Sequence, residues 1–398
     1  MESLKELTII SDDYPSEGRI VFVFVQQLAE SLVDLGVDVS IIAPQSITRF
    51  LFRGVKLLPK QKKYTTSSGN IYSVYRPYSL SFSNGNKFLY RISKAFNQRQ
   101  INKCLDIISP QIVYGHFWHN AMKGSDYTTS KGKPLFVACG EGDDALDNWA
   151  TRLSDKAREK VRKQINGVIS VSTENKRKCI EYGLSTEENT IVLPNCVNDK
   201  VFHPQEGLYF RKQLGASETD FVISFTGAFI DRKGYNRLSA AIDKLQDKSI
   251  RVIFSGKPMV GHENDMPHCK GILHCGPVNH DDLPKYLCAS DVFVLPTLKE
   301  GCCNAIVEAL ACGLPIISSD RPFNEDILNE GNSIKINPES VDDIADAIKR
   351  MMTDRDYYLK LRKYSLKHAG DYSIIDRAKK IMGFISKMTS INAGKKEY

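Results

Sequence analysis

The stretch from Asp291 to Asp320 constrains the fold most strongly, because it carries the pattern of a strand, a helix and a second strand. The apolar run 292–295 predicts a short strand that is buried on both faces. Residues 304–312 predict a helix with a small-residue face, and Gly313 lies where a glycine commonly ends a helix. Residues 314–318 predict the next strand. Such a unit is typical of α/β domains with parallel sheets.

The loop 299–304 follows the first of these strands, at the end where ligands of parallel sheets bind. Gly301 lets the backbone approach a ligand closely, and the free N–H groups of the helix start suit an anion. Glu300 on the loop and Glu308 on the helix could both reach one ligand, because a helix rises about 1.5 Å per residue. Glu308 is costly to bury without a partner. The alternative is that Glu308 is a solvated helix residue and Glu300 an ordinary loop charge.

The pair Glu300-Gly301 is followed by the run EALACGLP at residues 308–315. This combination resembles the signature of the family 4 retaining glycosyltransferases, and the resemblance covers most of the chain, best from residue 221 to 326. It implies an α/β fold of the GT-B type, with two facing doubly wound Rossmann-like domains, an active site in the cleft and a C-terminal helix that crosses back to the first domain. The expected parts are an acceptor-binding domain, a nucleotide-sugar-binding domain and a crossover helix with its tail, at residues 1–200, 201–372 and 373–398.

The segment after the predicted strand 221–225 resembles the family pattern G-R-L-x-x-x-K-G, whose arginine and lysine hold the donor diphosphate. Lys233 and Gly234 match this pattern, whereas Ala228 stands at the arginine position, and Arg232 is the expected substitute. Cations here would stabilise the charge that develops on the diphosphate as the glycosidic bond breaks. The alternative is a pair of surface basic residues before a helix.

The resemblance also implies how the donor is held. Glu308 is expected to bind the ribose hydroxyls, and the donor sugar is expected to contact Glu300 and the loop residues Gly301, Cys302, Cys303 and Asn304. His116 follows the predicted strand 111–115, and a histidine at this place contacts the donor sugar in the family, although a packed core histidine is the alternative. We expect Glu300, His116 and Lys233 to act in catalysis.

Two segments of the first half are expected to face the donor phosphate or the acceptor. Gly18 lies in the loop 14–18, which resembles the glycine-bearing loop with which such enzymes open. Glu141 and Asp143 stand where the family often has H-G-x-D, so its histidine is replaced here. We expect Glu141 and Asp143 to bind an acceptor, while an ordinary connecting loop is the alternative for Gly18.

The formal net charge is +7, and its placement is informative because no acidic residue occurs between Asp38 and Asp106. Basic and aromatic residues alternate through residues 49–103. This composition suits an anionic partner, and we expect this region to contact an anionic membrane. The alternative is that the amphipathic segment 88–108 is only a covering helix of the first domain.

The remaining composition points to a cytoplasmic protein, at most peripheral to the inner face of the membrane. No apolar run approaches the roughly 18 residues of a membrane helix, and no secretory signal is evident. The ten cysteines have no regular spacing, which favours reduced thiols over disulfides or a zinc site. We expect no cofactor, no essential metal and no nucleic-acid partner.

These observations predict a retaining glycosyltransferase that moves a sugar from a nucleotide-diphosphate-sugar, expected to be a UDP-sugar, to an acceptor hydroxyl. A bacterial surface polysaccharide or a lipid-linked glycan is the expected acceptor. Two alternatives stay open. One is a nucleotide-sugar epimerase of the same architecture, and the other is a non-catalytic partner subunit that binds nucleotide-sugar without turnover.

Overall fold

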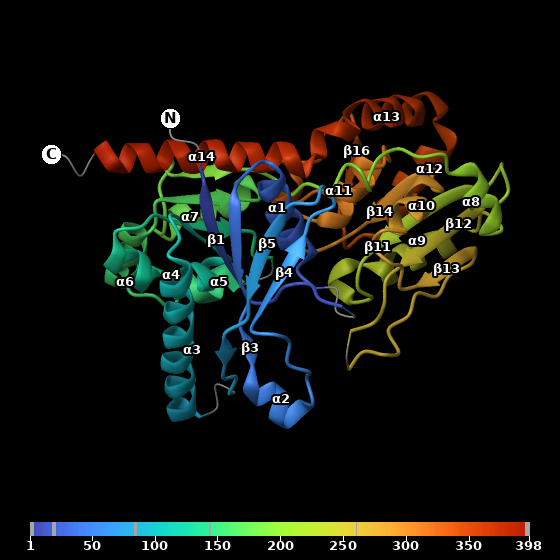
Figure 1. Ribbon diagram of the computed structural model, residues 1–398. Helices are drawn as coiled ribbons and strands as arrows, with labels where there is room; N and C mark the ends of the chain where they lie inside the picture. The colour runs from blue at the N-terminus through green and yellow to red at the C-terminus, as the bar shows by residue number, and fades with distance from the viewer. Residues whose placement is uncertain (1–3, 18–20, 83–85, 143–144, 260, 395–398) are drawn as a thin grey trace. The chain divides into compact units, whose positions relative to one another are not determined.

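The computed structural model describes residues 4–17, 21–82, 86–142, 145–259 and 261–394 (Figure 1). The chain forms two compact units, and its path passes between them more than once. Unit 1 comprises residues 1–171, 175–193 and 375–398, and unit 2 comprises residues 172–174 and 194–374. Each unit is an α/β structure around its own sheet.

Unit 1 contains an eight-stranded sheet in the order β10-β9-β8-β7-β1-β2-β5-β4. Neighbouring strands are parallel except for the antiparallel pair β4–β5. The order reverses at β1, which lies between β2 and β7, so this is the switch point at which ligands of such sheets bind. The strands are β1 (Glu6–Ser11), β2 (Asp38–Ile42), β4 (Gln61–Thr65), β5 (Ile71–Tyr75), β7 (Val113–His116), β8 (Leu135–Cys139), β9 (Gly167–Ser170) and β10 (Thr190–Val192).

Helices cover both faces of the unit 1 sheet. One buried cluster joins the sheet to α1 and α14, and another joins it to α3 and α4. A separate short pair, β3 and β6, lies beside α2 and α3. The bounds are α1 (Val23–Asp34), β3 (Gln45–Ser46), α2 (Ile47–Arg53), β6 (Tyr78–Ser79), α3 (Lys87–Ile108), α4 (Trp118–Lys131), α5 (Ala145–Ala150), α6 (Asp155–Gln164), α7 (Thr173–Glu181) and α14 (Ile374–Gly394).

Unit 2 contains a six-stranded parallel sheet in the order β13-β12-β11-β14-β15-β16. Its switch point lies between β11 and β14. The strands are β11 (Phe221–Thr226), β12 (Ile250–Ser255), β13 (Ile272–Gly276), β14 (Val292–Leu295), β15 (Ile316–Ser319) and β16 (Ser333–Ile336). The helices are α8 (Leu208–Gln213), α9 (Tyr235–Leu245), α10 (Leu283–Cys288), α11 (Asn304–Ala311), α12 (Val341–Thr353) and α13 (Arg355–His368), with short 3-10 turns η1 (Asp231–Lys233), η2 (Pro322–Asn324) and η3 (Ala369–Tyr372).

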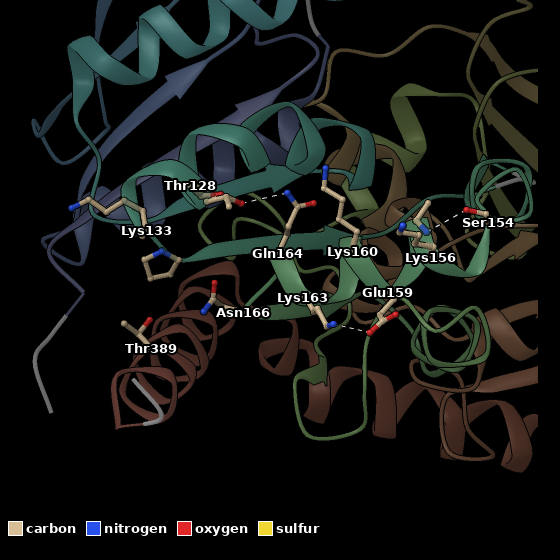
Figure 2. Close-up of a pocket in the computed structure, with 14 residues that line it drawn as sticks. Thr128, Lys133, Ser154, Lys156, Glu159, Lys160, Lys163, Gln164, Asn166 and Thr389 are labelled. Carbon is tan, nitrogen blue, oxygen red and sulfur yellow. Dashed lines mark hydrogen bonds and ion pairs between the residues drawn. The ribbon is translucent and has the colours of Figure 1, made fainter. Parts of the chain in front are cut away.

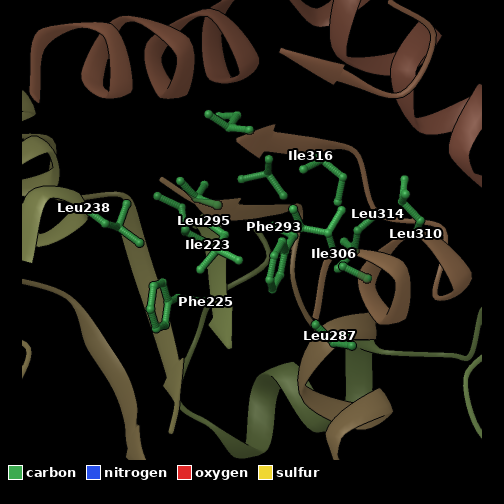
Figure 3. Close-up of a cluster of buried hydrophobic side chains, with 14 of the residues drawn as sticks. Ile223, Phe225, Leu238, Leu287, Phe293, Leu295, Ile306, Leu310, Leu314 and Ile316 are labelled. Atoms are coloured by element: carbon green, nitrogen blue, oxygen red, sulfur yellow. The ribbon is translucent and has the colours of Figure 1, made fainter. Parts of the chain in front are cut away.

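The strand–helix–strand segment from Asp291 to Asp320 forms the middle of unit 2. Strands β14 and β15 are buried along their length, and Figure 3 shows Phe293 and Ile316 among the side chains that pack with α11. Gly313 has φ +77° after the helix, and a Cβ there would lie 2.5 Å from Leu366. The predicted strand, helix, glycine stop and second strand are therefore confirmed.

Several strands were not predicted. They are the short pair β3 and β6, the strands β4 and β5, which pair as an antiparallel ladder, and the strands β13 and β16, which lie at the two edges of the unit 2 sheet. The last helix also continues to Gly394, beyond any end that its apolar pattern marks. No helix within the described ranges is both long and apolar enough to cross a bilayer.

Candidate active site

The switch point of unit 2 places two functional loops next to each other. The loop after β11 leads into η1, which carries Arg232 and Lys233, and the loop after β14 carries Glu300. Gly234 permits this approach, since it has φ +77° and an added Cβ would lie 2.4 Å from the carbonyl oxygen of Pro296. Residues far apart in the sequence therefore meet beyond the carboxyl ends of neighbouring strands.

Lys233 and Glu300 form an ion pair at this point. The Lys233 Nζ atom lies 2.6 Å from Glu300 Oε1, and the two side chains are only 15% and 11% exposed. The hydroxyl of Thr297 donates to the same carboxylate oxygen at 2.7 Å. The carboxylate is therefore fixed in a largely buried setting, where ionic interactions are stronger than in water.

Arg232 joins the same carboxylate. Its Nη1 atom lies 3.2 Å from Glu300 Oε1 and donates to the carbonyl oxygen of Lys299 at 2.6 Å. The structure thus brings Arg232, Lys233 and Glu300 together, with two cations on one carboxylate oxygen. This cluster, Arg232, Lys233 and Glu300, is called the cation pair site below.

The charge state of the site follows from its surroundings. Burial acts to lower the pKa of Lys233, but Cys303 and Glu300 act to raise it, and the net pKa lies above the usual lysine value. Burial also raises the pKa of the Cys303 thiol to about 11. Lys233 is therefore a cation and Cys303 a neutral thiol near neutral pH.

Hydrogen bonds hold the loop between β14 and α11. Ser319 donates to the carbonyl oxygen of Thr297, and the side-chain amide of Asn195 donates to the carbonyl oxygen of Cys302 at 3.2 Å. The same amide donates to Asn304 Oδ1 at 2.7 Å. Gly301 is buried, whereas Asn304 is exposed. The loop is thus fixed from two sides, which presents its backbone in one conformation.

Within the described part of the chain, Glu308 pairs with His280 and not with the cation pair site. Its side chain is buried within α11, and its Oε1 atom lies 3.1 Å from His280 Nε2. Burial acts to lower the pKa of His280, whereas the bond and the charge of Glu308 raise it, and the net pKa lies above 6.5. The expectation that a buried Glu308 needs a partner is met by a histidine that we did not predict.

His116 lies in unit 1 as the last residue of β7. It is 6% exposed, its ring packs 5.2 Å from Phe24 and 4.7 Å from Phe117 between centroids, and its Nδ1 atom has no hydrogen-bond partner within the described ranges. Burial lowers its pKa to about 3, and the nearby charge of Arg377 adds to this effect. His116 is therefore a neutral imidazole with one unsatisfied nitrogen.

Glu141, also in unit 1, binds main-chain groups. Its Oε1 atom accepts the N–H of Trp118, the first residue of α4, at 3.0 Å, and its Oε2 atom accepts the N–H of Gly140 at 3.1 Å. Burial raises its pKa, against the opposing effect of these bonds. Its carboxylate thus stabilises the start of α4. The other expected residues of this part, Gly18 and Asp143, lie outside the described residues.

Three further polar residues were not singled out from the sequence. Thr297 and His280 contact the two expected carboxylates, and Asp12 lies 2.5 Å from His119, a residue of α4 in unit 1. Thr297 and Asp12 each lie just after a buried strand, a signal that could have been used. His280 and Glu308 are far apart in the sequence, and no pattern near either residue indicates that they pair.

A cavity of about 1020 Å³ in unit 1 involves none of the expected residues (Figure 2). It lies beside α6, α14 and the segment that leads into β8, so it is at the amino ends of the strands. Four lysines are among its lining residues, and Glu159 pairs with one of them, Lys163, at 2.7 Å. Ligands of parallel sheets bind at the opposite edge, so this cavity is not the candidate site.

Comparisons with known proteins agree with this arrangement. Sucrose-phosphate synthase from Thermosynechococcus elongatus has a similar structure, with a TM-score of 0.75 at 16% identity over 97% of this chain and all of that one. The Bacillus subtilis protein TuaC, which carries the name of a teichuronic acid biosynthesis glycosyltransferase, is 25% identical over 84% of this chain and 85% of its own length. The Escherichia coli UDP-Gal:alpha-D-GlcNAc-diphosphoundecaprenol alpha-1,3-galactosyltransferase is 29% identical over 54% of this chain and 58% of its own length.

The two units, each built on a largely parallel sheet, together with the structural likeness show the GT-B fold, as the sequence predicted. The model for Glycosyltransferase Family 4 matches residues 21–201, and the model for Glycosyl transferases group 1 matches residues 209–368. The chain belongs to the family 4 glycosyltransferases of the GT-B fold.

Proposed function

We propose that this glycosyltransferase moves a sugar from a UDP-sugar to a hydroxyl of a lipid-linked glycan in bacterial polysaccharide synthesis, with retention of the donor's anomeric configuration. The observation that carries the proposal is the cation pair site, where Arg232 and Lys233 share one oxygen of Glu300. The names of the relatives supply support, since one cites UDP-Gal with a diphosphoundecaprenol-linked acceptor and another cites teichuronic acid.

In this proposal the donor diphosphate takes the place of Glu300 as the partner of the two cations. A charge-assisted hydrogen bond contributes about 1.5–3 kcal/mol, so two cations can hold a diphosphate firmly. Glu300, released from the cations, would then accept the sugar hydroxyls together with the loop from Gly301 to Asn304. Glu308 would accept the ribose hydroxyls, and His280 would orient it through their shared hydrogen bond.

The chemical step needs no other charged group. The bond between the anomeric carbon and the β-phosphate oxygen breaks, and the bond to the acceptor oxygen forms on the same face of the sugar. The proton of the acceptor hydroxyl passes to the leaving phosphate oxygen. Arg232 and Lys233 stabilise the negative charge that develops there, which is a role that an essential metal would otherwise fill. We propose that His116 also serves the reaction as a neutral hydrogen-bonding group.

The lipid-linked acceptor fits the surface of unit 1. Helix α2 exposes three successive apolar side chains, and Phe88 at the start of α3 is 70% exposed. Both helices contact β6, and Figure 1 shows them projecting from the same end of the unit. Basic residues surround these apolar groups throughout residues 49–103. We propose that this surface contacts an anionic membrane, which sedimentation with anionic and neutral vesicles at low salt would test.

The experiment that tests the proposal is a transfer assay with Lys233→Ala. Donors are first identified by thermal shift, because a bound nucleotide-sugar raises the melting temperature. Transfer to a lipid-linked acceptor is then measured, and Lys233→Ala is expected to lower kcat by about 10²–10³, the loss that removal of one oxyanion-hole donor causes in other enzymes. Lys285→Ala is the matched control, because this lysine is exposed and pairs with an exposed carboxylate, Asp282, at 2.7 Å.

Two outcomes would contradict the proposal. Conversion of the donor to an altered sugar without an acceptor would identify an epimerase. Donor binding without turnover, under conditions where Lys233→Ala loses the binding, would identify a non-catalytic subunit. The anomeric configuration of the product, measured by NMR, decides between retention and inversion.

A further inference from the structure

The cavity of about 1020 Å³ in Figure 2 is a second place where unit 1 can hold a ligand. Its lining includes Pro134 and Asn166, which directly precede the parallel neighbours β8 and β9, so it lies at the amino edge of the sheet. Strand β8 is five residues long, so about 15 Å of sheet separates the cavity from the carboxyl edge. A ligand here is therefore remote from the edge where His116 ends β7.

Helix α6 contributes a row of three lysines to this cavity. Lys156, Lys160 and Lys163 all line it, and their spacing of four and three residues puts them on one face of the helix. With a rise of ~1.5 Å per residue, neighbouring lysines of the row lie ~6 and ~4.5 Å apart along the axis. A fourth lysine, Lys133, comes from the turn before β8, and in the view of Figure 2 Lys160 lies between it and Lys156.

Most of this positive charge is not neutralised within the protein. Glu159, an acidic residue of the lining, pairs with Lys163 at 2.7 Å. Lys133, Lys156 and Lys160 form no ion pair with any residue that the structure describes. Like charges one helical turn apart repel each other, so an anion between them stabilises the arrangement. The row suits an extended ligand with repeated negative charges better than a single small anion.

The uncharged part of the lining suits a carbohydrate. Thr129 and Gln164 hydrogen-bond to each other at 3.3 Å and keep further donors and acceptors of the kind that sugar hydroxyls need. None of the fourteen described residues that line the cavity is aromatic, and none is a large exposed apolar residue. Single-stranded nucleic acids stack their bases on aromatic side chains, and membrane surfaces take up exposed apolar ones. The lining therefore favours a charged glycan over either of these partners.

We propose that this cavity is a docking site for an anionic polysaccharide whose sugar units carry carboxylates, and that it is distinct from the cation pair site of unit 2. Lys133, Lys156 and Lys160 pair with successive carboxylates, and the hydroxyl and amide groups of the lining bind sugar hydroxyls between them. The site holds a part of the chain that is remote from the reacting end, which keeps the enzyme on the glycan between reactions. This role goes beyond the proposed function and rests on it only for the identity of the chain.

The first test is the affinity for fluorescently labelled hexagalacturonate, a short chain of uronic acids, measured by anisotropy at two salt concentrations. All proteins carry Lys233→Ala, because Arg232 then pairs with Glu300 at 3.2 Å and leaves no unpaired cation in the cation pair site. In this background, Lys156→Gln/Lys160→Gln is expected to lower the affinity about tenfold and to reduce its salt dependence, because two exposed cations are lost.

The matched control is Lys363→Gln/Lys367→Gln, which removes two exposed lysines at the same spacing on α13 of unit 2 and is expected to change nothing. No binding by the Lys233→Ala parent, or equal losses in the two double variants, overturns the proposal. Equal affinity for an oligothymidylate of the same length overturns it too, because the lysines would then bind any polyanion.

A second pair of variants tests the wall of the cavity that faces α6. Thr389 on α14 lines the cavity, whereas its neighbour Ser390 is exposed outside the lining, and each hydroxyl donates to the carbonyl oxygen four residues earlier. Thr389→Glu is expected to weaken hexagalacturonate binding about tenfold, because it places a carboxylate among the bound ones, and Ser390→Glu much less, because solvent screens it. Equal effects of the two variants contradict a bound chain in the cavity.

Sedimentation with phosphatidylglycerol vesicles separates the glycan from a membrane. If Lys156→Gln/Lys160→Gln stops sedimenting but keeps its affinity for hexagalacturonate, the lysines bind the bilayer and the proposal is wrong. No donor or acceptor enters any of these measurements. Their failure would therefore leave the proposed sugar transfer in place, and failure of sugar transfer would leave the docking site in place.

Discussion

The cation pair site makes a quantitative prediction about stability. Glu300→Ala removes the counter-charge of Lys233 and Arg232, whose side chains are 15% and 31% exposed. Breaking a buried ion pair from one side costs about 3–5 kcal/mol, and the partial exposure of both cations reduces this to about 2–4 kcal/mol. For a unit of this size, that loss lowers the melting temperature by roughly 2–4 °C per kcal/mol.

UDP should restore part of this stability. In Glu300→Ala, Arg232 and Lys233 no longer pair with a carboxylate, so a diphosphate can bind them without displacing one. UDP is therefore expected to raise the melting temperature of Glu300→Ala by more than it raises that of the wild type. Because UDP carries no sugar, the proposed contact of Glu300 with sugar hydroxyls does not enter this comparison.

The assay is thermal unfolding of both proteins with and without UDP, at constant pH and salt, with urea unfolding to give the free energies of unfolding. Glu339→Ala is the matched control, since Glu339 also pairs with an arginine, Arg321, at 3.1 Å, but is 66% exposed. Its loss should cost less than about 1 kcal/mol. Equal costs for the two variants, or a smaller UDP effect in Glu300→Ala than in the wild type, would refute this account of the site.

Three further outcomes follow from the structure. Since Glu308 raises the pKa of His280, the stability from this pair is complete below pH ~6.5 and is lost as pH rises through the folded-state pKa; His280→Asn should therefore cost less at pH 8.5 than at pH 6, in unfolding measured at both. Gly234→Ala should destabilise by at least about 1–2 kcal/mol because of its positive φ and the contact of its new Cβ, whereas Gly383→Ala on α14 meets nothing within 4 Å and should be neutral or stabilising. His116→Asn should lower kcat without changing the shape of the pH–rate profile above pH 5, because the pKa of His116 is about 3; a lost limb in that profile would contradict a neutral imidazole.

The parts of the fold that were predicted from sequence are those with local signals. Residues 291–320 carry an apolar strand, a small-residue helix, a glycine stop and a second apolar strand, and each is found in place. Helix α3 also begins within a residue of the amphipathic segment 88–108 and ends with it. A helix with one buried stripe and a strand buried on both faces each have a characteristic apolar pattern. These elements can therefore be predicted without knowing which other elements they pack against.

Three of the unpredicted strands, β4, β13 and β16, are edge strands. Strand β4 has four exposed residues of five, and β13 is only half-buried throughout. An edge strand has one partner and needs no continuous apolar run, so its sequence does not distinguish it from a loop. Its position is fixed by pairing with a neighbour, which is a property of the tertiary structure.

The candidate site divides in the same way. Lys233 and Glu300 were identified because each lies in a motif with fixed spacing, and the structure joins them directly. His280 was missed because its significance comes from a buried carboxylate that it contacts, Glu308. This relation leaves no trace in the neighbouring sequence.

Because helix α14 belongs to unit 1 but is translated last, unit 1 can complete its core only after all of unit 2 has been synthesised. Its residues Ala378, Ile381 and Ile385 complete a core that β1 begins, while residues 194–374 between them belong to unit 2. At about 5–20 residues per second, the ribosome takes roughly 10–40 s to translate that interval. During this interval the apolar face of unit 1 that α14 covers is exposed. Exposed apolar surface of this kind is what chaperones bind, and it is buried once the last helix has been synthesised.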